Sequence, residues 1–105
     1  MSISIGGYAF EGPYSSADYL EYRSGVYAIL DKRSDGKYYV VDVGESAIVK
    51  TRIETHDRKD CWERNKQGVL TVAVYYTHTL NLQQPGRLVI EQEIRDKFNP
   101  LCGAR

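Results

Sequence analysis

The stretch that decides the fold is GVYAILDKRSDGKYYVVDVG, residues 25–44. Residues 26–30 are apolar and partly β-branched, and a second apolar run follows at residues 38–44. The polar segment between them contains Ser-Asp-Gly, and residues of these types favour a tight turn. The pattern therefore predicts two antiparallel strands joined as a hairpin.

The second predicted strand carries an aspartate, Asp42, two residues before its closing glycine. Because side chains alternate between the two faces of a strand, regular alternation predicts two groups: Tyr39, Val41 and Val43 on one face, and Tyr38, Val40 and Asp42 on the other. A carboxylate among apolar side chains is costly unless it is paired or hydrogen-bonded. Asp42 is therefore a candidate functional residue.

Four further elements follow the hairpin. In chain order they are a helix, a short helix, a central strand and a last helix, expected at residues 47–56, 61–66, 69–80 and about 86–98. Ser46 is a suitable N-cap for the first helix, and Pro85 fits the first turn of the last one. Residues 69–80 are the most β-like run of the chain.

Residues 1–24 show the least regular pattern, with one short helical segment that Ser15 or Ser16 would cap. The predicted fold is α+β, with a small three-stranded antiparallel sheet flanked by helices. It is expected to form a single domain over residues 1–105, with its core at 25–103 and an N-terminal extension at 1–24.

Composition narrows the class of protein. The chain has 105 residues, of which 42% are hydrophobic and 27% charged, as is usual for one globular domain. The formal net charge of zero argues against a strongly basic, free-standing nucleic-acid binder. No basic segment precedes a long apolar run, so we expect a cytoplasmic protein without a membrane contact. Cys61 and Cys102 are expected to be free thiols in a reducing compartment.

An ordered set of short motifs resembles the GIY-YIG nuclease superfamily. Gly25-Val26-Tyr27 stands where the family has Gly-Ile-Tyr, and Asp42-Val43-Gly44 stands where it has Tyr-Ile-Gly. Arg52 matches the family's arginine, and His56, one turn further on, matches a histidine found in part of the family. In EQEIRDKFNP, Glu91 takes the place of the metal-binding glutamate.

The chain departs from the family pattern at three positions and in its hairpin, which is a few residues longer than usual. Asp42 replaces a tyrosine, and Arg95 stands at the second of two aliphatic positions after the glutamate. Gly103 lies near the place where the family often has an asparagine. These departures leave open whether the chemistry of the family is retained.

The resemblance implies an endonuclease that acts on DNA with a divalent cation. One carboxylate with several waters suits Mg²⁺ (or Mn²⁺), and Glu91 would be that carboxylate. Arg52 would bind the scissile phosphate, while Tyr27 and His56 would handle the attacking water and its proton. Asp42 would be a second metal ligand, a partner of Arg52 or an acceptor for His56.

Lys50 and Arg58 lie on or just after the helix of Arg52 and are expected to contact phosphates of the nucleic acid. The neutral charge suggests weak affinity for the domain alone, so a protein partner, a homodimer or a branched or nicked substrate would supply the specificity.

Two other interpretations stay open. One is a catalytically inactive module on the same fold that binds nucleic acid or another protein; the other, weaker, is hydrolysis of a different phosphorylated substrate. Each residue also has a purely structural interpretation. Tyr27 would be a packed strand aromatic, and Glu91 would join Arg87 and Arg95 in a surface ion-pair row worth about 0.2–0.5 kcal/mol per pair.

Overall fold

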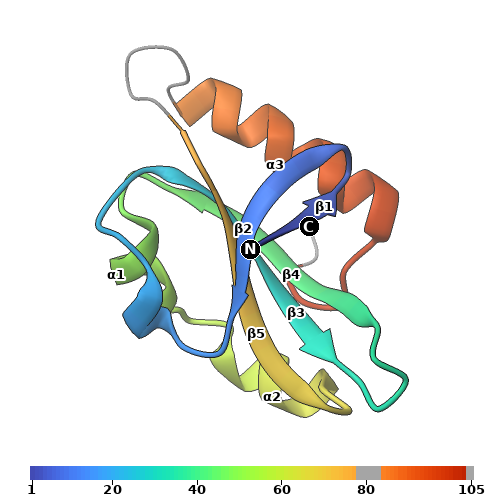
Figure 1. Cartoon of the computed structure of the whole chain (residues 1–105). Coiled ribbons are helices and arrows are strands. Elements are labelled where there is room, and N and C mark those ends of the chain that lie inside the picture. The colour runs from blue at the N-terminus through green and yellow to red at the C-terminus, as the bar shows by residue number, and fades with distance from the viewer. Residues whose placement is uncertain (78–83, 104–105) are drawn as a thin grey trace.

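The predicted hairpin forms, and it lies within a larger sheet than expected. In the computed structural model, which describes residues 1–77 and 84–103, five antiparallel strands are covered by helices on both faces (Figure 1). The elements in chain order are β1 (Ser2–Ile5), β2 (Tyr8–Tyr14), the 3₁₀ helix η1 (Ala17–Tyr19), β3 (Gly25–Lys32), β4 (Tyr38–Ser46), α1 (Val49–Glu54), α2 (Lys59–Asn65), β5 (Val69–Tyr76) and α3 (Gln84–Phe98).

The prediction of a three-stranded sheet is wrong, because the strand order is β1-β2-β5-β3-β4. The two additional strands come from the N-terminal extension. Gly6 and Gly7 have φ values of +60° and +88°, which two-residue hairpin turns require and glycine adopts easily. β2 then pairs with β5, so β5 is a central strand, as predicted; residues 78–80 of that prediction lie outside the described residues.

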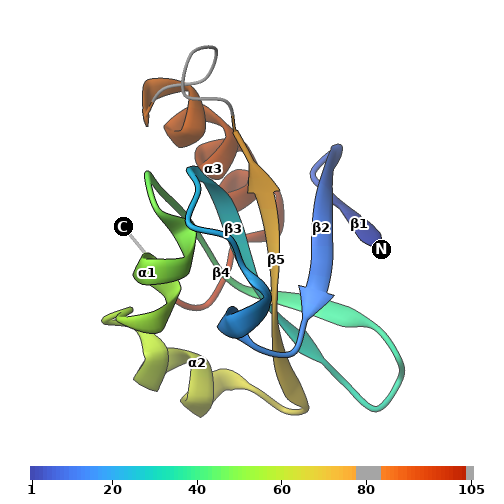
Figure 2. The same ribbon diagram turned by 60° about the vertical axis from the view of Figure 1, so that its left-hand side comes forward.

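The sheet buries an apolar layer on each face. Figure 2 shows α1 and α2 together on one side of the sheet. On one face, β3 and β5 pack against α1 and α2, which contribute Ile53 and Trp62. On the other face, Ile90 and Ile94 of α3 meet Phe10 of the N-terminal hairpin. The two layers place α1 and α2 opposite α3, with the edge strand β4 in contact with all three helices.

A β-bulge interrupts β4 directly before Asp42. Two successive residues of β3 pair with Asp42 and Val40, so Val41 is an extra residue in β4. The insertion shifts the alternation: Val41 joins the layer of α1 and α2, whereas Val43 joins the layer of α3. The predicted grouping of Val41 with Val43 on one face is therefore wrong. Asp42 stays on the same face as Gly44 and is hydrogen-bonded to Arg58 and Trp62 of the α2 region, whereas Val40 lies on the opposite face.

The expectation of two free thiols is also wrong, because Cys61 and Cys102 form a disulfide. They are 41 positions apart in the sequence, and the fold brings their Cα atoms to 5.9 Å. The bond joins α2 to the segment that follows α3. Across residues 1–77 and 84–103, no helix has the length and apolar character needed to cross a bilayer.

Candidate functional site

Tyr27, in the middle of β3, and His56, just after α1, meet in the interior. The phenol oxygen of Tyr27 lies 2.6 Å from Nε2 of His56, and the backbone N–H of Arg58 donates to Nδ1 of His56 at 3.0 Å. Because Nδ1 accepts a hydrogen bond, neutral His56 carries its proton on Nε2 and donates it to Tyr27. His56 is thus a hydrogen-bond donor to the tyrosine and not a base for it.

The charge states of this pair follow from its burial, since Tyr27 is 1% exposed and His56 is 5% exposed. Burial raises the pKa of Tyr27 to about 12, although the positive charge of Arg52 opposes the shift. Burial, together with the positive charges of Arg52 and Arg58, lowers the pKa of His56 to about 4. Both side chains are therefore neutral near pH 7, and neither lies where a substrate would reach it.

Asp42 is fully buried and accepts hydrogen bonds on both carboxylate oxygens. Oδ2 accepts from Nε of Arg58 at 2.8 Å and from Nε1 of Trp62 at 2.7 Å. Oδ1 accepts from Nη2 of Arg95 at 2.9 Å and from the backbone N–H of Val43 at 2.8 Å. Burial opposes ionisation, but the hydrogen bonds from Arg58 and Trp62 and the charge of Arg58 outweigh it and hold the pKa of Asp42 below its usual value.

These contacts decide among the three roles that were open for Asp42. Its partners are Arg58 and Arg95, and neither Arg52 nor His56 is hydrogen-bonded to it among the described residues. Its oxygens already accept five hydrogen bonds from four residues, which leaves little room for a metal ion. Asp42 acts as a clamp that holds two arginine side chains in place. Conversely, its hydrogen bonds and negative charge raise the pKa of Arg58, against the opposing effect of partial burial.

A pocket of about 280 Å³ opens beside this clamp, between the start of α2 and the face of α3. Its walls are formed by Arg58, Leu88, Glu91, Gln92, Arg95 and Gly103. Oε2 of Glu91 accepts from Nε of Arg95 at 3.1 Å, and no residue among 1–77 and 84–103 donates to Oε1. The side chain of Arg58 is 29% exposed. Glu91 and Arg58 thus share one solvent-accessible space.

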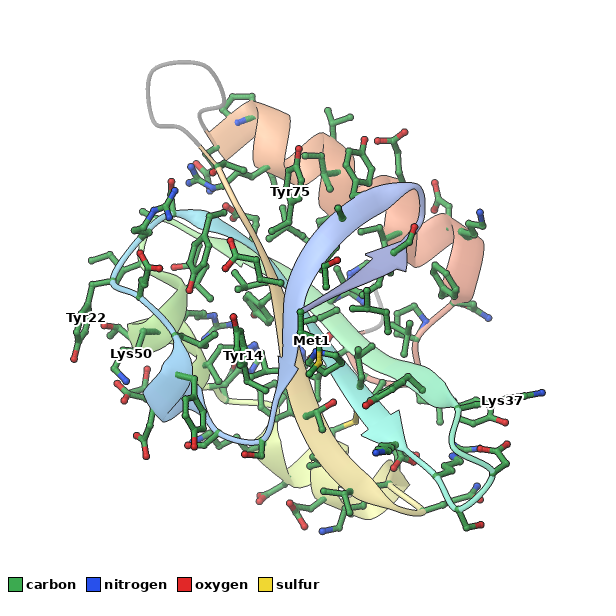
Figure 3. The ribbon with its side chains drawn as sticks, in the orientation of Figure 1. Met1, Tyr14, Tyr22, Lys37, Lys50 and Tyr75 are labelled. Carbon is green, nitrogen blue, oxygen red and sulfur yellow. A yellow bond between two sulfur atoms is a disulfide. The ribbon has the colours of Figure 1, made fainter. Side chains whose placement is uncertain are left out.

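The remaining predicted site residues lie outside this pocket. Arg52 is about one third exposed and pairs with Asp57 at 3.1 Å. Lys50 donates to the backbone oxygen of Ala17 at 3.0 Å and lies beside the ring of Tyr22 (Figure 3). The structure therefore brings six residues together as a continuous series of hydrogen-bonded neighbours: Tyr27, His56, Arg58, Asp42, Arg95 and Glu91. Lys50 does not belong to this series.

The three departures from the family pattern meet at one point. Asp42 is hydrogen-bonded to Arg95. Gly103 packs on both, since a Cβ atom added there would lie 2.7 Å from Oδ1 of Asp42 and 2.6 Å from Nη2 of Arg95. The guanidinium of Arg95 thus neutralises the carboxylate of Asp42, and the absence of a side chain at Gly103 leaves room for both. The sequence signal was present, because Arg95 stands where an aliphatic residue is expected, but its partner could not be read from the sequence.

Gly44 has a steric reason for its identity. It pairs with Tyr27 across β3 and β4, and a Cβ atom at this position would lie 2.1 Å from the phenol oxygen. No other residue fits while the ring of Tyr27 keeps its place. The glycine that ends the second motif and the tyrosine of the first motif are therefore a packed pair.

Comparison with known proteins identifies no relative: no protein-family model, no curated protein and no solved structure matches the chain. The resemblance to GIY-YIG nucleases depends on the quoted motifs and stays a prediction.

Proposed function

We propose that this domain hydrolyses phosphodiester bonds of DNA with the help of a divalent cation, in the pocket between the start of α2 and α3. The observation that supports this proposal most directly is the sharing of that pocket by the Arg58 guanidinium and the Glu91 carboxylate. A phosphate needs a cationic donor, and a hard cation needs a carboxylate. DNA as the substrate comes from the resemblance to the nuclease superfamily.

The donor set suits Mg²⁺ or Mn²⁺. Nε of Arg95 positions Oε2 of Glu91, and Oε1 is without a donor among the described residues. Mg²⁺ is commonly held by one or two carboxylates and keeps several waters, so a single carboxylate is a sufficient anchor. The described residues contain no group of three or more His, Cys, Asp or Glu side chains that would enclose a metal ion, so the remaining ligands would be waters and phosphate oxygens. A bound cation would lower the pKa of a coordinated water.

This proposal changes the roles of several residues from those that the motifs alone suggest. Arg58 takes the phosphate contact in the pocket, and Asp42 and His56 hold it there from behind. Tyr27 supports His56 and does not act on the substrate. These buried partners lower the entropic cost of presenting Arg58 in one orientation. Arg52, outside the pocket, would contact the phosphate backbone further along the nucleic acid.

A second function is favoured by the state of Asp42. Its carboxylate neutralises charge on Arg58 and Arg95, at the position where the family has a site tyrosine. A domain with this exchange would bind a nucleic-acid phosphate in the same pocket without cleaving the backbone. The two functions share the pocket and differ in whether Glu91 holds a cation.

Nicking of supercoiled plasmid by the purified domain separates these functions. We would compare Mg²⁺, Mn²⁺ and chelator for the wild type, Glu91→Gln and the matched control Glu93→Gln. Glu93 lies on the same helix but contacts Tyr8, away from the pocket. Cation-dependent nicking by the wild type and the control, lost in Glu91→Gln, supports hydrolysis. DNA binding without nicking supports the second function, and the absence of both binding and nicking contradicts the two proposals together.

A further inference from the structure

The segment after α3 turns back over the clamp and forms one wall of the pocket. The backbone N–H of Cys102 donates to the carbonyl of Val41 at 3.0 Å, and the carbonyl of Cys102 accepts from Nη1 of Arg95 at 3.2 Å. Gly103 then lies against Asp42 and Arg95 and lines the pocket beside Arg58. The position of residues 99–103 therefore decides how far the pocket extends toward the clamp.

Apart from the disulfide, residues 99–103 are held by the two hydrogen bonds of Cys102 and by the hydrogen bond from the N–H of Asn99 to the carbonyl of Arg95. Leu101 is 65% exposed, so its side chain contributes little packing. Cys102 is buried, and its sulfur is bonded to Cys61, which is only partly buried on α2. Nδ2 of Asn65 lies 3.4 Å and 3.6 Å from the two sulfur atoms. The disulfide adds to these hydrogen bonds a covalent link between α2 and the pocket wall.

We propose that the Cys61–Cys102 disulfide is a redox lock on the pocket, which reduction by a dithiol protein opens. This regulation rests on the proposed function, because it acts on the pocket of Arg58 and Glu91. A disulfide that ties a pocket wall to a neighbouring helix is suited to redox control wherever a dithiol reductant is present. Release of Cys102 also frees Nη1 of Arg95 from its carbonyl acceptor.

The Cys61–Cys102 disulfide is reduced by thiol–disulfide exchange with the dithiol. One thiolate of the reductant attacks the sulfur of Cys61, which is the more accessible of the two, and the S–S bond breaks. Cys102 leaves as a thiolate, beside the amide donor of Asn65, and takes a proton from water. The second thiol of the reductant then attacks the mixed disulfide and releases Cys61 as a thiol. The protein gains two electrons and two protons, and the reductant becomes a disulfide.

The test compares oxidised wild type, wild type reduced with dithiothreitol, and the double variant Cys61→Ser/Cys102→Ser. Hydrogen exchange at residues 99–103 reports the lock, and cation-dependent nicking of plasmid reports the pocket. We expect exchange at residues 99–103 to rise about tenfold or more on reduction while β3 and β5 keep their protection. Nicking should rise with it, and the double variant should behave as reduced in either buffer.

The outcomes separate this inference from the proposed function. Unchanged exchange at residues 99–103 after complete reduction overturns the lock, whatever the nicking rate. Faster exchange with equal nicking in both states overturns the control of activity. Faster exchange with no nicking in either state contradicts the proposed function and leaves the structural lock supported. If the double variant does not fold, reduced wild type gives the same comparison; global unfolding of that protein too would show a purely structural disulfide.

Discussion

Replacement of Asp42 by asparagine is expected to destabilise the fold by about 3–5 kcal/mol, the usual cost of breaking a buried ion pair by removing one partner. The change keeps the shape of the side chain but removes the charge that Arg58 and Arg95 share. The Arg95 side chain is only 6% exposed, so water cannot replace the lost carboxylate. Asparagine would also place an amide donor against guanidinium donors. Glu91 remains paired with Arg95, which keeps the estimate within this range.

Urea denaturation followed by tryptophan fluorescence is a direct assay, because the chain has one tryptophan, Trp62, and its indole N–H donates to Asp42. Asp96→Asn, an exposed substitution of the same type on α3, is the control and should change the free energy of unfolding by no more than about 0.5 kcal/mol. A cost below about 1 kcal/mol for Asp42→Asn, with an unchanged m-value, would refute the account of Asp42 as a charged clamp.

The difference in stability between wild type and Asp42→Asn should also depend on pH, in a direction set by the lowered pKa of Asp42. The pKa of Asp42 is held below its usual value in the folded state, so its contribution is complete above the unfolded carboxyl pKa of about 3.9 and is lost as the pH falls through the folded pKa. The difference in stability between wild type and Asp42→Asn should therefore be constant from about pH 5 upward and shrink in acid. A difference that grows in acid would contradict this assignment.

Three further predictions concern the neighbours of the clamp. Gly44→Ala should cost about 1–3 kcal/mol or more in urea denaturation, because the new Cβ overlaps the phenol of Tyr27; an unchanged midpoint would show that the ring moves freely. The free energy of unfolding should rise between pH 4 and 6.5, by up to about 1.4 kcal/mol per pH unit, because the histidine of the unfolded chain binds a proton there and folded His56 does not. His56→Gln should flatten this pH profile, and an equally steep profile for the variant would exclude His56 as the cause. Trp62→Phe should cost at least about 1.5 kcal/mol by removing the indole donor to Asp42, measured by circular dichroism during denaturation; a smaller loss would mean that the two arginines satisfy the carboxylate alone.

Much of the local structure could be read from the sequence. The β3–β4 hairpin, the strand β5 and the helix α3 follow from apolar periodicity and turn residues, and Ser16 caps η1 as one of the two serines proposed for that role. The N-terminal hairpin also had a signal, Gly6-Gly7 between two β-like runs. An isolated two-stranded hairpin is only marginally stable, and this one is stabilised by pairing with β5 and packing on α3. The count of strands therefore depended on contacts far along the chain.

The candidate site divides in the same way. The motif positions identified Tyr27, Asp42, His56 and Glu91 as polar residues worth attention, and the structure links them in one series of contacts. Their roles could not be predicted, because the partners of Asp42 come from distant parts of the chain and burial left the tyrosine and histidine neutral. Whether the pocket cleaves DNA stays a prediction.

By itself the sequence determined the β3–β4 hairpin, the strand β5 and the helix α3, since those preferences depend on neighbours a few residues apart. The tertiary structure alone decided that Asp42 lies between Arg58 and Arg95, 16 and 53 positions away, and that Cys61 bonds to Cys102. The physical reason is that a buried carboxylate or thiol takes whichever partners the packing of α2 and α3 around β4 brings within reach.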